Sequence, residues 1–367
     1  MQGVAQARAG GGFAELLARE LAADRALYLA IGAYCAATVA LLAATGNAHL
    51  LAHGQYLESW PLVFAVAMPA TVLAAEFWLV AMRGAVGRAW GDVGPARPDL
   101  SARRLARLAA GVVLMQAFGL FTGSFTSLKN ALPAWRGGFG YDAPLADLDR
   151  WLHGGADPAA ALAAIGIDGW LFALIEANYS QAWFVVVYGA LFLVAISPAA
   201  DRVRLRFAVA FMATWVVCGN LFAGAFMSAG PVYFAEVTGD SARFAPLMAY
   251  LAGGDGTATA LYRGYLWQAY LLGEAGLGTG ISAFPSVHVG AVFLIALFAA
   301  ERGPLLGLVA GLYAGLVLFS SVLLGWHYAV DGYFSIVAVV LIWLTTRRLA
   351  APAKAAGKAV AGGRVLS

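Results

Sequence analysis

Two histidines and an aspartate in the last quarter of the chain have a spacing that suits nucleophilic or acid–base chemistry. His327 and Asp331 lie four residues apart, so on a helix they share one face and the carboxylate can accept a hydrogen bond from the imidazole. An imidazole oriented in this way is neutral near pH 7 and can attack an electrophile. His288, in SAFPSVHVG, can protonate a leaving group. The alternative is a His–Asp pair that only stabilises the fold.

Two further features have both a chemical and an ordinary interpretation. Lys129 and Arg136, in KNALPAWR, either face an anion or are a pair of interfacial cations whose side chains reach the membrane surface. His49 and His53 have a spacing that suits a metal, but a solvated helix is the favoured interpretation, because only Glu58 lies nearby as a further ligand. We leave both histidines out of the predicted site.

The composition excludes a soluble enzyme and predicts that helices in lipid position these residues. Of the 367 residues, 62% are hydrophobic and 12% are charged. Soluble domains have about 25% charged residues. A membrane span needs about 20 apolar residues, and we expect eight, at 26–45, 60–82, 105–126, 178–197, 205–227, 285–300, 304–324 and 329–346. The predicted fold is therefore an all-α polytopic membrane protein, with interfacial helices in two long extracytoplasmic loops. We expect residues 160–177 to be one such amphipathic segment.

The positive charges predict the orientation of the chain. Eighteen of the 23 Lys and Arg residues fall in the segments that would face the cytoplasm if both termini did. We therefore expect a cytoplasmic lead-in (1–25), a single transmembrane catalytic domain (26–349) and a cytoplasmic tail (350–367). Both histidine motifs then lie at the extracytoplasmic face. Cys35 and Cys218 lie inside apolar runs and imply no disulfide.

Other polar residues allow other classes of protein. Glu76, Gln116 and Asn220 lie in apolar runs and are compatible with a transporter, although contacts between helices are the favoured interpretation. The loop residues Asp142, Asp149 and Asp157 are compatible with a polyprenyl-phosphate glycosyltransferase. The order of the two histidine motifs argues against that class.

The motifs resemble those of the type 2 phosphatidic acid phosphatase superfamily over residues 105–346. SAFPSVHVG is similar to the Pro-Ser-x-His motif of the superfamily. The segment 320–331 is similar to its Ser-Arg-x5-His-x3-Asp motif, and the segment 129–136 is similar to its Lys-x6-Arg-Pro motif. Within the superfamily the chain looks most like the inositol phosphorylceramide synthases and their bacterial relatives. The stretch YDAPLADLDRWLHGGADP also resembles that branch. Three positions depart from the motifs: Gly137 stands in place of the proline, Val287 in place of the usual glycine, and Ser321 in place of the arginine. Without that arginine the chain lacks one bidentate phosphate ligand of the motif.

The resemblance implies a role for each motif residue. His327 attacks phosphorus and becomes phosphorylated, Asp331 orients it, and His288 protonates the departing oxygen. Lys129, Arg136 and Ser286 hold the phosphate oxygens. The resemblance requires no metal and no cofactor, and positive charge around a transferring phosphoryl group is what this chemistry needs.

These observations predict a phosphotransferase that acts on a phospholipid. Its partners are a phospholipid donor, an alcohol acceptor and the membrane, and no nucleic acid is expected. The transferred group is inositol phosphate by the resemblance, and the acceptor is a lipid or sugar alcohol such as ceramide. Asp142, Asp149 and Tyr233 are candidate substrate residues in aromatic-rich loops that would exclude water. A lipid phosphate phosphatase is the main alternative.

Overall fold

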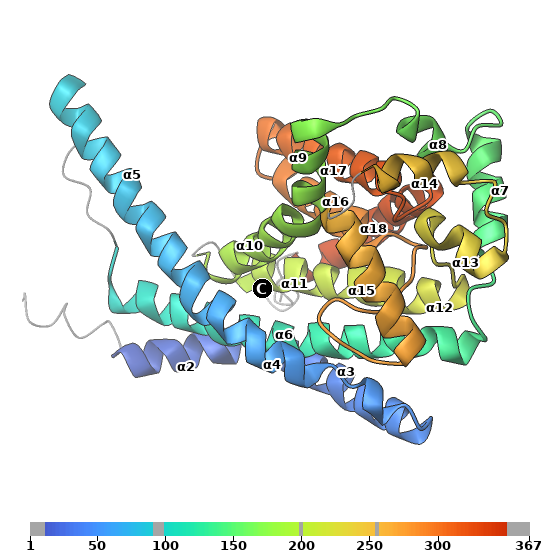
Figure 1. The fold of residues 1–367 in the computed structure, drawn as a ribbon. Helices are drawn as coiled ribbons and strands as arrows, with labels where there is room; N and C mark the ends of the chain where they lie inside the picture. The colour runs from blue at the N-terminus through green and yellow to red at the C-terminus, as the bar shows by residue number, and fades with distance from the viewer. Residues whose placement is uncertain (1–11, 91–98, 198–200, 254–256, 351–367) are drawn as a thin grey trace, which may run out of the picture.

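Every regular element in the described part of the chain is a helix (Figure 1). The structure, a computed structural model, describes residues 12–90, 99–197, 201–253 and 257–350. A backbone in lipid must satisfy its own hydrogen bonds, and a helix does so within one segment. The predicted all-α polytopic class is thus confirmed. Residues 1–11 of the predicted lead-in and 351–367 of the predicted tail lie outside the described residues.

Among the described residues, seven helical stretches are long and apolar enough to cross a membrane, and an eighth apolar helix is shorter. The helices that form these stretches are α3 (Arg25–Ala44), α4 (His53–Pro61), α5 (Met68–Trp90), α6 (Ala102–Arg136), α9 (Gly169–Ala177), α10 (Trp183–Ala195), α11 (Asp201–Val216), α12 (Ala223–Ala225), α17 (Pro304–Leu323) and α18 (Ala329–Ala350). The short helix is α16 (Val287–Ala300). Three π-helical turns, η3 (Leu62–Ala67), η4 (Asn178–Ala182) and η5 (Val217–Phe222), join α4 to α5, α9 to α10 and α11 to α12.

The predicted spans differ from these helices at three places. The second stretch begins at Ala48 rather than at residue 60. The third stretch ends at Arg136 rather than at residue 126, so Lys129 and Arg136 lie on α6 and not in the loop after it.

The fourth stretch begins at Gly169, so residues 169–177 form the first part of a continuous apolar stretch and are not a segment separate from the predicted span at 178–197. The acidic Glu176 suggested an interface. In the folded chain it is buried, and it accepts a hydrogen bond from the backbone N–H of Thr259, which offsets part of the cost of burial.

Ion pairs join the helices at one end of the bundle. Arg204 lies 3.0 Å from the Asp24 carboxylate, and Arg206 donates to Glu301 at 2.7 Å. Helix α2 (Phe13–Ala23) packs beside α6 at this end, in the described part of the predicted lead-in (Figure 1). Buried arginines are tolerated in such a position because they are paired.

Two polar residues inside predicted spans make contacts between helices. Glu76 pairs with Arg104, and the Tyr34 hydroxyl donates to Asn220 Oδ1 at 2.7 Å. The preferred interpretation of both residues, as contacts between helices, is confirmed.

Short helices from the two long loops gather at the other end of the bundle (Figure 1). We call this part, residues 137–168, 226–253 and 257–286, the cap. Its elements are α7 (Asp142–Leu152), α8 (Pro158–Ala163), η6 (Pro231–Tyr233), α13 (Phe234–Thr238), α14 (Ala245–Ala252) and α15 (Ala258–Leu272). The short turn η2 (Ala48–Leu50) belongs to the second apolar stretch and not to the cap. The cap has its own apolar cluster, in which Tyr233, Leu247 and Tyr328 are buried. Because Tyr328 follows His327, this cluster anchors the segment that carries the predicted nucleophile.

Candidate active site

His327 lies in the tight turn that joins α17 to α18. The turn requires a glycine at Gly325, whose φ of +71° is left-handed and where a Cβ would come within 2.7 Å of Val232. The Gly325 carbonyl accepts the N–H of Val232, which ties the turn to the cap. The backbone N–H of His327 donates to the Ser321 carbonyl at 3.2 Å. Both ends of the turn are thus fixed, so the imidazole has a defined position.

The Asp331 carboxylate orients the ring of His327. His327 Nδ1 lies 3.2 Å from Asp331 Oδ2, which also accepts the N–H of Tyr328 at 3.0 Å. Oδ2 accepts the Tyr328 N–H and so acts as an acceptor, which assigns the proton of the neutral imidazole to Nδ1 and leaves Nε2 unprotonated. Burial, and secondarily the nearby Lys129 ammonium, lower the pKa of His327 to about 3. The free imidazole is therefore neutral at pH 7, the form that acts as a nucleophile.

His288 faces His327 from the first turn of α16. The centroids of the two rings are 6.3 Å apart. Tyr179 stacks on His288 at 4.7 Å, and Trp183 lies against the ring at 4.1 Å. The indole N–H of Trp183 also donates to the His288 carbonyl at 3.0 Å. Two aromatic residues from one helical stretch therefore hold the second imidazole beside the first.

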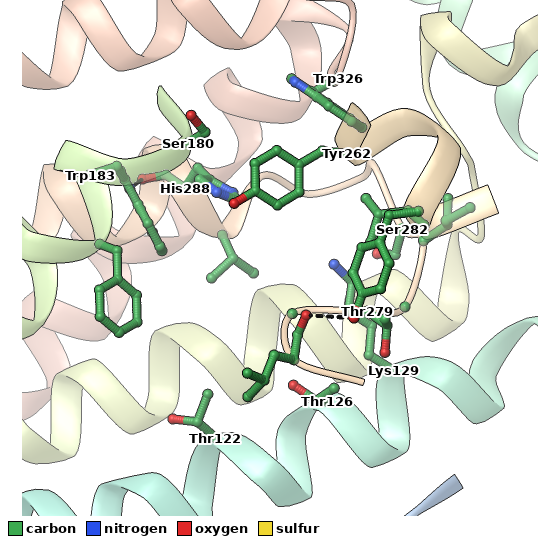
Figure 2. Close-up of a pocket in the computed structure, with 18 of the residues that line it drawn as sticks. Thr122, Thr126, Lys129, Ser180, Trp183, Tyr262, Thr279, Ser282, His288 and Trp326 are labelled. Atoms are coloured by element: carbon green, nitrogen blue, oxygen red, sulfur yellow. Dashed lines mark hydrogen bonds between the residues drawn. The ribbon is translucent and has the colours of Figure 1, made fainter. Parts of the chain in front are cut away.

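Both histidines line a cavity of about 480 Å³ beneath the cap. Aromatic and apolar side chains form most of its wall, and Thr122, Thr126 and Lys129 line it from one face of α6 (Figure 2). Lys129 has no ion-pair partner within 4.0 Å among the described residues. A cation without a counter-ion beside two histidines suits an anionic ligand.

The predicted phosphate and substrate residues do not all reach this cavity. Lys129 and Tyr233 line it, whereas Arg136 and Ser286 do not. Arg136 is the exposed last residue of α6. The Ser286 hydroxyl is fully buried and caps α16 by accepting the N–H of Val289 at 3.3 Å. Seven residues separate Arg136 from Lys129, which puts about 10 Å of helix between them.

Asp142 and Asp149 hold the segments around the histidines instead of lining the cavity. Asp142 accepts the N–H groups of Ala229 and Gly230 at 2.8 Å each, and the Tyr328 hydroxyl at 2.8 Å. At Gly230 a Cβ would lie 2.6 Å from the Trp326 carbonyl oxygen, so the two segments touch. Burial raises the pKa of Asp142, and its backbone hydrogen bonds oppose the rise.

Asp149 makes the corresponding contact with the start of α18. Its two oxygens accept the N–H groups of Ala329 and Val330 at 3.0 Å each. A carboxylate at a helix N-terminus satisfies backbone donors that have no partner within the helix. Helix α7 therefore holds the Tyr328 hydroxyl through Asp142 and the backbone directly after Tyr328 through Asp149, next to His327.

Glu176, Tyr179 and Trp183 are among the residues of the cavity wall that the sequence analysis did not place in the site. Their spacing of three and four residues is the signal that places them on one helix face. Because the sequence analysis ended an interfacial segment at residue 177, it assigned Glu176 to a different element from Tyr179 and Trp183. His53 shares a hydrogen bond with the Ser124 hydroxyl at 2.8 Å.

The fold and the cavity together define a polytopic helical membrane protein with a buried His–Asp pair, a second histidine and a lysine around one cavity. A family model of the PAP2 superfamily matches residues 143–346, more than half of the chain, and the protein belongs to that superfamily. Neither the curated proteins nor the solved structures gave a match. Superfamily membership supports phosphatase or phosphotransferase chemistry on a lipid phosphate. Lys129 and Arg136 lie before the matched region, so only the structure connects Lys129 with the histidines.

Proposed function

We propose that this protein is a membrane phosphotransferase that acts on a phospholipid through a phosphohistidine at His327. The observation that carries the proposal is the meeting of His327, His288 and Lys129 at one cavity, with the two imidazole centroids 6.3 Å apart. The cavity wall is mostly aromatic and apolar, which suits a lipid substrate.

The proposed reaction has two steps with one phosphorylated intermediate. In the first, His327 Nε2 forms a bond to phosphorus, the bond from phosphorus to the diacylglycerol oxygen breaks, and a protonated His288 gives its proton to that oxygen. In the second, an alcohol oxygen attacks the phosphorus, His288 takes the alcohol proton, and the bond from phosphorus to His327 breaks. Asp331 stabilises the charge on His327, and Lys129 offsets charge on the phosphoryl oxygens.

The aromatic side chains around the cavity support transfer to an alcohol rather than to water. Tyr233, Tyr262 and Trp326 line it from the cap side and from the His327 turn. A wall of this kind limits bulk water at the phosphohistidine, so a bound alcohol becomes the favoured acceptor. Inositol phosphate as the transferred group and ceramide as the acceptor remain the finer part of the proposal, supported by the motif resemblance.

The test supplies purified protein with phosphatidylinositol labelled in its phosphate, with and without ceramide or other alcohols. We expect label in a new lipid only when an alcohol is present, and transient label on the wild-type protein but not on His327→Ala. If label is released only as inositol phosphate, at a rate that no alcohol changes, the protein is a phospholipid hydrolase and the transferase proposal fails.

We further propose that the cavity opens at the extracytoplasmic face and that both termini are cytoplasmic. The distribution of Lys and Arg supports this orientation. Single cysteines at the exposed positions Ser241 and Ala102, in a chain without Cys35 and Cys218, test it in intact cells. A membrane-impermeant thiol reagent should label the cysteine at Ser241 and leave that at Ala102 unlabelled. The opposite pattern would reverse the orientation.

A further inference from the structure

One acidic side chain lines the cavity without a role in the proposed reaction. Glu176 is 6% exposed and is the only carboxylate among the described residues that form the cavity wall. Its Oε1 accepts the backbone N–H of Thr259 at 2.9 Å. Its Oε2 has no hydrogen bond or ion pair with any described residue. Because Glu176 lines the cavity, this oxygen can accept a hydrogen bond from a bound ligand, and a hydrogen bond to a charged group contributes binding energy.

The position of Glu176 relates it directly to the histidines. It precedes Tyr179 by three residues, so the two side chains are neighbours on one helix face, about 4.5 Å apart along the axis. Tyr179 in turn stacks on His288. Glu176 precedes Tyr179 along the chain and accepts the N–H of Thr259 in the cap helix α15, so it lies on the cap side of the residue that touches His288. It therefore faces the part of a substrate that extends from the phosphorus towards the cap.

The charges of the cavity orient a phosphate-containing substrate. Lys129 attracts the phosphate, whereas Glu176 repels it, so the phosphate lies by Lys129 and the histidines. A carboxylate only accepts hydrogen bonds, so the group beside Glu176 must donate one. The neighbouring wall residues Thr259 and Tyr262 carry hydroxyls. A ligand hydroxyl can donate to Glu176 and also accept from these groups, which an ammonium cannot do.

We propose that Glu176 is a specificity residue that binds a hydroxyl of the substrate, either on a polyol head group of the donor or on the acceptor alcohol. This inference rests on the proposed function, since it assumes that the cavity takes a phospholipid. A hydrogen bond to a charged group contributes enough for its loss to reduce kcat/KM by about 10- to 100-fold.

The experiment compares Glu176→Gln with wild type on three donors, phosphatidylinositol, phosphatidylethanolamine and phosphatidic acid. Glu236→Gln is the matched control, because Glu236 pairs with Arg263 and does not line the cavity. For a donor-side hydroxyl we expect Glu176→Gln to lose about 10- to 100-fold in kcat/KM on phosphatidylinositol, and less than about threefold on phosphatidic acid, which has no head group. For an acceptor-side hydroxyl, phosphoenzyme formation stays normal and only transfer to the alcohol slows by that factor.

Two results would overturn the proposal. One is an equal loss of kcat/KM with all three donors and in both steps, and the other is a loss confined to phosphatidylethanolamine, which would make Glu176 an ammonium site.

If wild type turns over no phospholipid, the proposed function fails, and the subsite is tested by calorimetry that compares the binding of inositol phosphate with that of inorganic phosphate. A preference for inositol phosphate that Glu176→Gln removes supports the subsite, and its absence in wild type refutes it. Glu176→Asp, which withdraws the carboxylate by one methylene, replaces Glu176→Gln if that variant fails to fold.

Discussion

Replacing Asp149 by asparagine should damage both stability and turnover without touching the substrate. Asp149 is 2% exposed, and its two oxygens accept the N–H groups of Ala329 and Val330 at 3.0 Å each. Asparagine has one acceptor oxygen, so its amide would face a backbone donor. The loss of a charge-assisted hydrogen bond costs about 1.5–3 kcal/mol, and loss of the negative charge at the start of α18 costs up to ~2 kcal/mol. We expect a net loss of about 2–4 kcal/mol in the free energy of unfolding.

The same substitution should also misplace the nucleophile. Ala329 and Val330 follow His327 by two and three residues, so a shift of their backbone displaces the imidazole. A displacement of about 1 Å reduces the rate by about 10²-fold. We therefore expect kcat to fall by 10- to 100-fold, with little change in KM, because Asp149 does not line the cavity. Thermal unfolding in detergent and steady-state kinetics on a phospholipid donor measure the two effects.

Asp147→Asn is the matched control on the same helix. Asp147 is 71% exposed and pairs only with Arg243 in the described structure, so its substitution should cost no more than ~1 kcal/mol and leave kcat unchanged. Equal effects of Asp147→Asn and Asp149→Asn on both unfolding and kcat would refute the argument that Asp149 positions the His327 segment.

Three further predictions concern the histidines and the cations. His327→Ala should abolish turnover of every substrate. His288→Ala should lower kcat about 10²- to 10⁴-fold with an alkyl leaving group and regain activity with an aryl leaving group. Equal losses of kcat with both leaving groups would contradict these roles. An unfolded histidine binds a proton near pH ~6.5 and buried His327 only near pH 3, so wild type should lose stability as the pH falls between those values. His327→Gln should reduce that slope in unfolding measurements, and an unchanged slope would show that other groups cause it. Lys129→Ala should lower kcat/KM by at least about 10²-fold and Arg136→Ala by less than about threefold, since only Lys129 lines the cavity; the reverse order would restore Arg136 as the phosphate ligand.

Local sequence was sufficient for features that depend on neighbours along the chain. Apolar length predicted all eight apolar helices, because a segment in lipid can satisfy its backbone only as a helix. The four-residue spacing of His327 and Asp331 predicted their pairing, which the structure has at 3.2 Å between Nδ1 and Oδ2. The ordered histidine motifs also indicated the superfamily, which the family match confirms.

Tertiary structure decided how residues far apart in the chain meet. Asp142 and Asp149 were expected near substrate because they are acidic loop residues, yet each binds backbone N–H groups more than 80 residues away along the chain. Arg136 and Lys129 belong to one motif, but the length of α6 between them leaves only Lys129 at the cavity. Glu176 suggested an interface, because the sequence does not reveal the Thr259 N–H that receives its carboxylate. A charged side chain in an apolar sequence must be solvated or paired, and only the packing of the helices determines whether its partner is water, backbone or substrate.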